Sequence, residues 1–449
     1  MAKLRRFSAL VVVTMFGAAP LGCGPGRKPA PADPGRPPLA ITDPGGKVEP
    51  GTPGGKVEPG TPGPARRTAV EPKALSGTVE KGLAWLVKHQ LPSGAWGQGD
   101  EAVAMGGSMA QQRDAASLAD TSMALLALLR AGHEPNRGAY RDAVDKGLGF
   151  VLAEVESADA DSLYVTAARG TRVQGKIGPY ADTFAALVVL NEAKGRMRDG
   201  VANTRVDKAL AKIARKVEKN QKADGTFDGA GWAPVLSQAL AAKGMNRAAQ
   251  NGIEVDDVVL ERLEKQAHQA VNVDTATFAV DGAAGVGLYG AAAASSAARE
   301  SANTNSDKVY KMKQKRRDSG AMDSPDVPSK AAVAAAETKA RSVDMAADQV
   351  EGALVQNMES PAFVSGFGNN GGEEFLSYML VSESLAIKGG EKWATWDEKV
   401  TKLVSGVQNE DGSWTGHHCI TGRTFCTAAA LLVLMGDRTP APASVIATN

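Results

Sequence analysis

Two kinds of hydrophobic pattern alternate along the chain from about residue 74 onward, and both have the period of an α-helix. In the first kind, apolar residues lie on one face and charged residues on the other, as in 77–90, 141–155, 206–221, 258–271, 346–358 and 396–408. In the second kind, apolar residues fill almost the whole circumference, as in 120–132, 182–195, 232–244, 282–298, 373–390 and 425–436. Little in this region indicates strands. The pattern predicts an all-α fold built from six pairs of helices.

The alternation also predicts how the helices are arranged. A helix that is apolar on every side must be covered on every side, and an amphipathic helix can cover it with one face. Six alternations of the two kinds predict a buried ring of helices inside an outer ring, with the helical hairpin as the repeating unit. We therefore expect an (α/α)6 toroid over residues 74–438.

A short motif recurs at the ends of three amphipathic segments. The spacing Gln-x-x-x-Gly-x-aromatic is found in Gln90, Gly94 and Trp96, in Gln221, Gly225 and Phe227, and in Gln408, Gly412 and Trp414. The physical interpretation is a helix end, at which the glycine permits the turn and the aromatic side chain packs back. With an Asp-Thr start of the following apolar helix, the motif resembles the repeats of squalene–hopene cyclases and protein prenyltransferase β-subunits. That resemblance implies an α/α toroid with a central ligand cavity, and it implies less about function.

The termini are expected to lie outside this fold. Residues 1–23 have a basic start and a short apolar run that ends in Cys23, which is typical of a bacterial lipoprotein signal peptide with a lipidated cysteine. An ordinary cleaved signal is the alternative. Residues 24–73 are rich in Pro and Gly, repeat "PGGKVEPGT", and predict a disordered linker. We also expect a disordered tail at 439–449. These features together predict a lipid-anchored protein of the bacterial cell envelope, periplasmic or on the outer surface.

The charge balance limits the range of partners. The formal net charge is +1, which gives no electrostatic case for nucleic acid as the main partner. Residues 301–329 contain a basic run from Lys308 to Arg317. It predicts either a docking patch for an anionic partner or, as we favour here, a solvated and disordered insertion between the fourth and fifth helix pairs.

This sequence does not contain the catalytic acid motif of the cyclases at the start of an inner helix. Those enzymes protonate their substrate through an Asp-x-Asp-Asp motif at the start of an inner helix. Here only Asp120 and Asp182 remain, and Ala119 and Ala181 precede them. Each aspartate is expected to cap the helix that it opens. The segment from Glu254 to Asp257 resembles the motif but precedes a charged helix, where an N-cap is expected.

A zinc site like that of the prenyltransferases would have different ligands in this chain. Their Asp, Cys and His ligands lie on the last inner helices, and Cys426 falls where the resemblance places the histidine. The chemically acceptable zinc ligands in this region are Glu373, Glu374, His417, His418, Cys419 and Cys426, of which Glu374, His418, Cys419 and Cys426 form the candidate set. Since an exported protein usually oxidises an even pair of cysteines, a Cys419–Cys426 disulfide is the favoured alternative. The third alternative is that both cysteines are free buried thiols.

The same region is the best candidate for a functional site. Inner helices that start on one face of a toroid bring their first turns into one mouth, where Glu373, Glu374, His417, His418 and Arg423 are expected to converge. We expect a binding function for an isoprenoid, protein or glycan ligand, without the family's cyclase chemistry. An isoprenoid enzyme, an acid–base enzyme at a Glu/His mouth with zinc assistance, and a purely structural scaffold remain alternatives. No cofactor other than zinc is expected.

Overall fold

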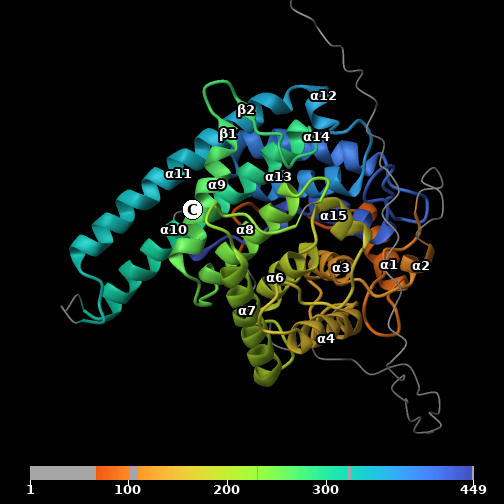
Figure 1. Ribbon diagram of the computed structural model, residues 1–449, viewed down its shortest axis with the longest axis horizontal. Helices are drawn as coiled ribbons and strands as arrows, with labels where there is room; N and C mark the ends of the chain where they lie inside the picture. The colour runs from red at the N-terminus through yellow and green to blue at the C-terminus, as the bar shows by residue number, and fades with distance from the viewer. Residues whose placement is uncertain (1–66, 102–109, 230, 321–324, 447–449) are drawn as a thin grey trace, which may run out of the picture. The chain divides into compact units, whose positions relative to one another are not determined.

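The computed structural model describes residues 67–101, 110–229, 231–320 and 325–446 (Figure 1). The expected signal peptide, Cys23 and most of the linker lie outside these ranges. In the described part the chain is mostly helical, as the all-α prediction requires, with one antiparallel pair of two-residue strands, β1 (Val271–Asn272) and β2 (Thr277–Phe278). In the same ranges, none of the helices is both long and apolar enough to cross a membrane.

Six helices are buried along most of their length and correspond to the apolar segments. They are α3 (Leu118–Arg130), α6 (Ala181–Ala193), α8 (Val235–Gln250), α10 (Gly287–Asp318), α13 (Gly372–Lys388) and α15 (Arg423–Leu434). Their contacts follow one order, in which α3 packs on α6, α6 on α8, α8 on α10, α10 on α13, α13 on α15, and α15 on α3. Each buried helix therefore has two buried neighbours.

The amphipathic segments form a second set, which packs on the buried helices with its apolar faces. These helices are α1 (Gly77–Lys88), α4 (Arg141–Ser157), α7 (Gly200–Asn220), α9 (Asp257–Gln269), α11 (Lys330–Met358) and α14 (Gly390–Ser405). Helices α4, α7, α9 and α11 contact α3, α6, α8 and α10 in turn, α14 contacts α13 and α15, and α1 contacts α15. Short helices complete the fold: α2 (Ala110–Arg113), α5 (Arg172–Ile177), α12 (Pro361–Val364), η2 (Gly436–Arg438) and α16 (Ala443–Ile446).

The recurring motif joins one amphipathic helix to the next. Each glutamine amide donates to the carbonyl of its own motif glycine and to a carbonyl in the following amphipathic helix. The second acceptors are Ala143 for Gln90 (2.8 Å), Val259 for Gln221 (3.3 Å) and Thr78 for Gln408 (2.9 Å). The last motif therefore binds the first helix of the series.

The tryptophan and glycine positions of the first and last motifs behave as expected, whereas Phe227 of the second motif packs against Phe184 of α6. The indole N–H of Trp96 donates to Leu86 O at 2.7 Å, and that of Trp414 donates to Val404 O at 2.8 Å, so each ring packs back on the helix before it. Gly412 has φ +91°, and a Cβ there would lie 2.8 Å from the Lys81 carbonyl oxygen. Only glycine accommodates both that backbone conformation and that contact.

Three of the expected boundaries are wrong. The basic run is not disordered, because residues 301–318 continue α10 and pack along α11 (Figure 1). Residues 67–73 of the expected linker and 439–446 of the expected tail are also ordered against each other. Thr68 forms a β-bridge with Pro440, and Ala441 N donates to Arg67 O at 3.0 Å. Composition alone missed the two terminal segments because their backbone groups bond to partners far away in the sequence. It missed the end of α10 because that charged helix packs on α11, a contact that composition does not indicate.

Candidate functional site

The start of α13 and the loop before α15 form the candidate site, and glycines allow their close approach. Gly371 is the N-cap of α13, and a Cβ there would lie 2.7 Å from Cε1 of His418. A Cβ on Gly372 would lie 2.5 Å from Ile420. Gly372 N also donates to Ile420 O at 2.9 Å, which fixes the loop across the first turn of the helix. This packing places His418 beside the two carboxylates that open α13.

Glu374 has a complete set of hydrogen-bond donors. Its Oε1 accepts from Phe367 N at 2.9 Å and from the hydroxyl of Tyr289. Its Oε2 accepts from the backbone N–H of the N-cap residue Gly371 at 2.9 Å and lies 3.0 Å from Nε2 of His418. A carboxylate with every lone pair engaged is an anchor for its neighbours rather than a free base.

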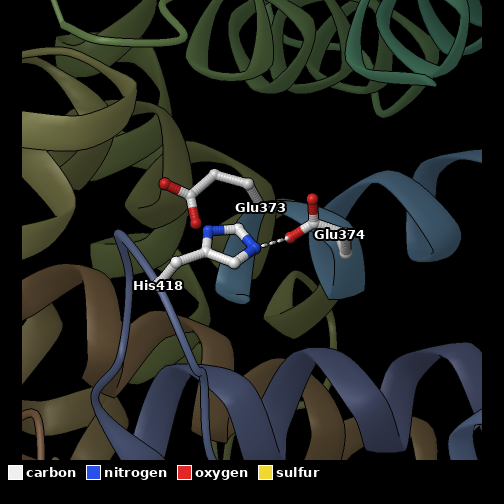
Figure 2. Close-up of side chains that lie close together, drawn as sticks. All are labelled: Glu373, Glu374 and His418. Atoms are coloured by element: carbon white, nitrogen blue, oxygen red, sulfur yellow. Dashed lines mark ion pairs between the residues drawn. The ribbon is translucent and has the colours of Figure 1, made fainter. Parts of the chain in front are cut away.

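His418 is held by one ring nitrogen. Its Nε2 lies 2.7 Å from Asn369 O and 3.0 Å from Glu374 Oε2 (Figure 2). Since both partners are acceptors, Nε2 carries a proton. Nδ1 is buried and has no hydrogen-bond partner among the residues that the structure describes. Burial would lower the pKa of His418, but the hydrogen bond to Glu374 and its charge outweigh burial and raise it.

Glu373 is the carboxylate that lacks partners. It is fully buried; Oε2 accepts from Ile420 N at 3.1 Å, and within the described part of the chain Oε1 has no hydrogen-bond partner. Burial, with a smaller contribution from the charge of Glu374, raises the pKa of Glu373 to about 7. In Figure 2 the imidazole ring lies between the two carboxylates, with Nε2 toward Glu374. One oxygen of each glutamate and one nitrogen of His418 lie within 4.8 Å of one another.

These three side chains are chemically suited to a divalent metal. Imidazole nitrogen and carboxylate oxygen are both zinc ligands. The two buried atoms without partners, Glu373 Oε1 and His418 Nδ1, are a free acceptor and a free lone pair. Glu374 binds the opposite nitrogen of the same ring, as second-sphere carboxylates do for metal-bound histidines. A cation would also relieve the cost of burying Glu373 in its charged form.

Four of the expected site residues do not join the Glu373, Glu374 and His418 group. The His417 side chain is exposed, and Arg423 pairs with Asp411 at 2.7 Å. Cys419 and Cys426 are both fully buried and are not joined by the expected disulfide, and neither belongs to the Glu/His group found among the described residues. The reason is local: Cys426 Sγ contacts Ile420 O at 3.5 Å from the first turn of α15, and Cys419 lies in the preceding loop with φ +50°.

The aspartates of the Asp-Thr starts have a different role from the one expected. Ser117, not Asp120, is the N-cap of α3, and its hydroxyl donates to Asp120 Oδ2 at 2.5 Å. Asp182 does not cap α6, because its Oδ1 accepts from Ala119 N at 2.9 Å in the first turn of the neighbouring α3. It therefore links two buried helices. The N-cap expected near Glu254–Asp257 is confirmed, since Asp256 accepts from Val258 N at 2.8 Å.

A closed ring of buried charges was missed by sequence reasoning. Its contacts are Arg130–Glu192 (3.2 Å), Glu192–Arg247 (3.9 Å), Arg247–Glu300 (2.8 Å), Glu300–Lys243 (3.2 Å), Lys243–Glu383, and Glu383–Arg130 (3.1 Å). We call these six residues the central ion ring. They come from α3, α6, α8, α10 and α13, and every side chain is at most 6% exposed. Glu383 lies ten residues after Glu373, about 15 Å along α13.

Comparison with known proteins adds no family to these observations. No family model matches the chain, and no curated protein matches it either.

Proposed function

We propose that this protein is a lipid-anchored bacterial envelope protein whose (α/α)6 toroid binds a ligand at one mouth, through a divalent metal held by Glu373 and His418. The single observation that carries the proposal is the pair of buried atoms without partners, Glu373 Oε1 and His418 Nδ1, on a ring fixed by Glu374. Zinc fits best, because both donors are among its common ligands and the ring is already oriented.

The toroid part of the proposal is supported by two independent features. The buried helices contact each other in an order that returns from α15 to α3. The motif glutamines connect successive amphipathic helices, and Gln408 returns to the first of them through Thr78 O. Both features are what an (α/α)6 arrangement requires. The anchor part rests on the sequence around Cys23 alone.

Binding is favoured over isoprenoid chemistry for two reasons. The central ion ring occupies space between the buried helices that a hydrocarbon ligand would need, and burying such a ligand against ionised groups is unfavourable. Asp182 also accepts from a backbone N–H and from the amide of Gln174, so it is poorly placed to protonate an alkene.

A hydrolytic enzyme is the second candidate, and one observation favours it. The pKa of Glu373 is about 7, so the carboxyl group can both accept and donate a proton near neutral pH. A metal at this site would supply Lewis acidity or a more acidic bound water. In both candidates Glu373 and His418 are the residues that contact the ligand or the metal.

The experiment is a titration of the full-length protein, first treated with chelator, with Zn2+ and with Co2+ by calorimetry. We expect about one equivalent to bind, and we expect Glu373→Gln and His418→Ala each to weaken binding at least about tenfold, because each removes a direct ligand. His417→Ala is the matched control, since its side chain is exposed beside the site. Circular dichroism confirms that the variants fold. Equal affinities in all four proteins, or no binding by the wild type, would refute the site.

A further inference from the structure

The far part of the α10–α11 hairpin carries a groove that the proposed metal site does not use. Two adjoining cavities of about 650 and 380 Å3 lie between the helices and share Lys313, Arg317 and Glu337. In Figure 1 the ends of α10 and α11 run together beyond the neighbouring helices. We call the two cavities together the hairpin groove.

The hairpin groove has a large excess of positive charge. Among the described residues, two acidic residues, Glu337 and Asp344, line it, and Asp348 and Glu351 pair with Arg299 at its edge. Seven cationic residues line it: Arg299, Lys313, Arg316, Arg317, Lys330, Arg341 and Lys388. The chain as a whole has a net charge of +1, so this excess is local. Cations gathered along one cavity favour an anionic ligand.

The acids in the groove are already engaged, and several cations have no acidic partner. Glu337 pairs with Lys313 at 2.6 Å, and Asp344 pairs with Arg299 at 2.8 Å and with Lys388 at 3.0 Å. Within the described ranges, no carboxylate forms an ion pair with Arg317, Lys330 or Arg341. These three are therefore the cations available to a ligand.

Helix electrostatics explain some of these cations but not Lys330. Cations near the end of α10 are favourable, since they face the negative end of the helix dipole. Lys330 is the first residue of α11, directly after the N-cap Ser329, where a positive charge is unfavourable. An anion at this position would interact favourably with Lys330, with Arg317 and with the free N–H groups of the first turn.

The other end of the groove includes a buried side chain, unlike the exposed cations near the end of the hairpin. The side chain of Arg299 is 3% exposed. Its terminal nitrogens pair with Asp344, Asp348 and Glu351 of α11, and its Nε has no hydrogen-bond partner in the described ranges. The walls there include Tyr310 and Ile387, and the C-terminal helix α16 packs on α10 beside them. A partly enclosed cavity with guanidinium groups at both ends suits an elongated ligand.

We propose that the hairpin groove binds a phosphate-bearing anion at Arg317 and Lys330, with Arg341, about 16 Å farther along α11, available to a second anionic group of the same ligand. Phosphate oxygens match the planar donor fork of arginine, and two of the three residues are arginines. The phosphate belongs either to a free phosphorylated molecule or to the headgroup of an anionic lipid. The proposal does not depend on the metal site, which involves none of these residues.

The test uses the full-length protein at low ionic strength. Calorimetric titration with inorganic pyrophosphate measures the free anion, and co-sedimentation with phosphatidylglycerol vesicles, against phosphatidylcholine vesicles, measures the lipid source. The groove variant is Arg317→Gln/Lys330→Gln/Arg341→Gln. The matched control is Lys208→Gln/Arg215→Gln/Lys265→Gln, which removes the same charge from exposed positions on α7 and α9.

We expect the groove variant to bind pyrophosphate or phosphatidylglycerol at least about tenfold more weakly, and the control to stay within about twofold of the wild type. Binding should also weaken as salt is raised, because exposed cations are screened. Pyrophosphate binding identifies a free phosphate ligand, and binding to vesicles alone identifies the lipid headgroup; both support the groove. Equal losses in the groove variant and the control, or no binding to either probe, would overturn the proposal.

Discussion

Removing one cation from the central ion ring should destabilise the fold strongly. Lys243 lies on α8, is 1% exposed, and contacts Glu300 at 3.2 Å and also Glu383. Replacing it in Lys243→Met keeps most of the side-chain length and removes only the charge. The variant leaves three buried carboxylates against two guanidinium groups, so one negative charge loses its compensation.

The expected loss in the free energy of unfolding is about 3–5 kcal/mol, the range for breaking a buried ion pair from one side. The double variant Lys243→Met/Glu383→Gln restores neutrality, with two cations and two carboxylates left in the ring. Its loss should therefore be smaller than the sum of the two single losses by more than about 1 kcal/mol. Lys208→Met, at an exposed position on α7, is the control and should cost less than about 0.5 kcal/mol.

The pH dependence separates a charge effect from a packing effect. Burial alone would raise the pKa of Glu383, but Lys243, Arg130 and Arg247 outweigh burial and hold the pKa at about 2. Without Lys243 the pKa of a ring carboxylate should rise above its unfolded value near 4. A raised folded pKa means that stability falls as the pH rises above 4. The variant's deficit should therefore be smaller at pH 4 than at pH 7.

Urea unfolding followed by circular dichroism at 222 nm, at both pH values, measures these free energies. The reasoning would be refuted if Lys243→Met cost no more than Lys208→Met. It would also be refuted if the single losses added up in the double variant, or if the deficit were the same at pH 4 and pH 7.

Three further predictions test the fold and the site. Gln408→Ala should lower the free energy of unfolding in urea by about 1–3 kcal/mol, because it leaves Thr78 O and Gly412 O without their donor, and Gln221→Ala, whose hydrogen bonds are longer, should cost less. The reverse order would contradict the role of Gln408 in joining the last motif to the first helix. Burial raises the pKa of Asp120 to about 7, above its unfolded value near 4, so the free energy of unfolding should fall as the pH rises between these values. Asp120→Asn should flatten this dependence of stability on pH, and an unchanged dependence would show that another group is responsible. Cys419 and Cys426 should react with a thiol reagent only after the protein is unfolded, because both are buried. Reductant should leave the intact mass of the protein unchanged, and an increase of about two mass units on reduction would show a disulfide.

The periodic parts of the fold are predictable from the sequence because they depend on local patterns. The apolar segments coincide with buried helices, and the motif residues Gln90, Gly94 and Trp96 occupy the turn that their spacing indicates. The approach of Glu373, Glu374 and His418 could also be expected, because two polar segments precede neighbouring apolar helices.

The interactions that cross between helices could not be predicted in the same way. Arg130 and Glu192 lie near the ends of apolar helices, and Lys243 lies near the end of the apolar segment 232–244, where a charged residue is unremarkable in the sequence. Only the packing of five helices brings them into one ring. Likewise, Asp182 looks like a cap of its own helix until the structure places it against Ala119 N. The oxidation state expected for the cysteines came from the compartment alone and not from their geometry.

The most direct test of the central claim is the metal content of the protein purified from its native host without chelator, measured by mass spectrometry alongside Glu373→Gln and His418→Ala. We expect about one equivalent of zinc in the wild type and a large loss of bound zinc in both variants. A folded wild-type protein with no bound divalent metal that also fails to take up Zn2+ or Co2+ would contradict it.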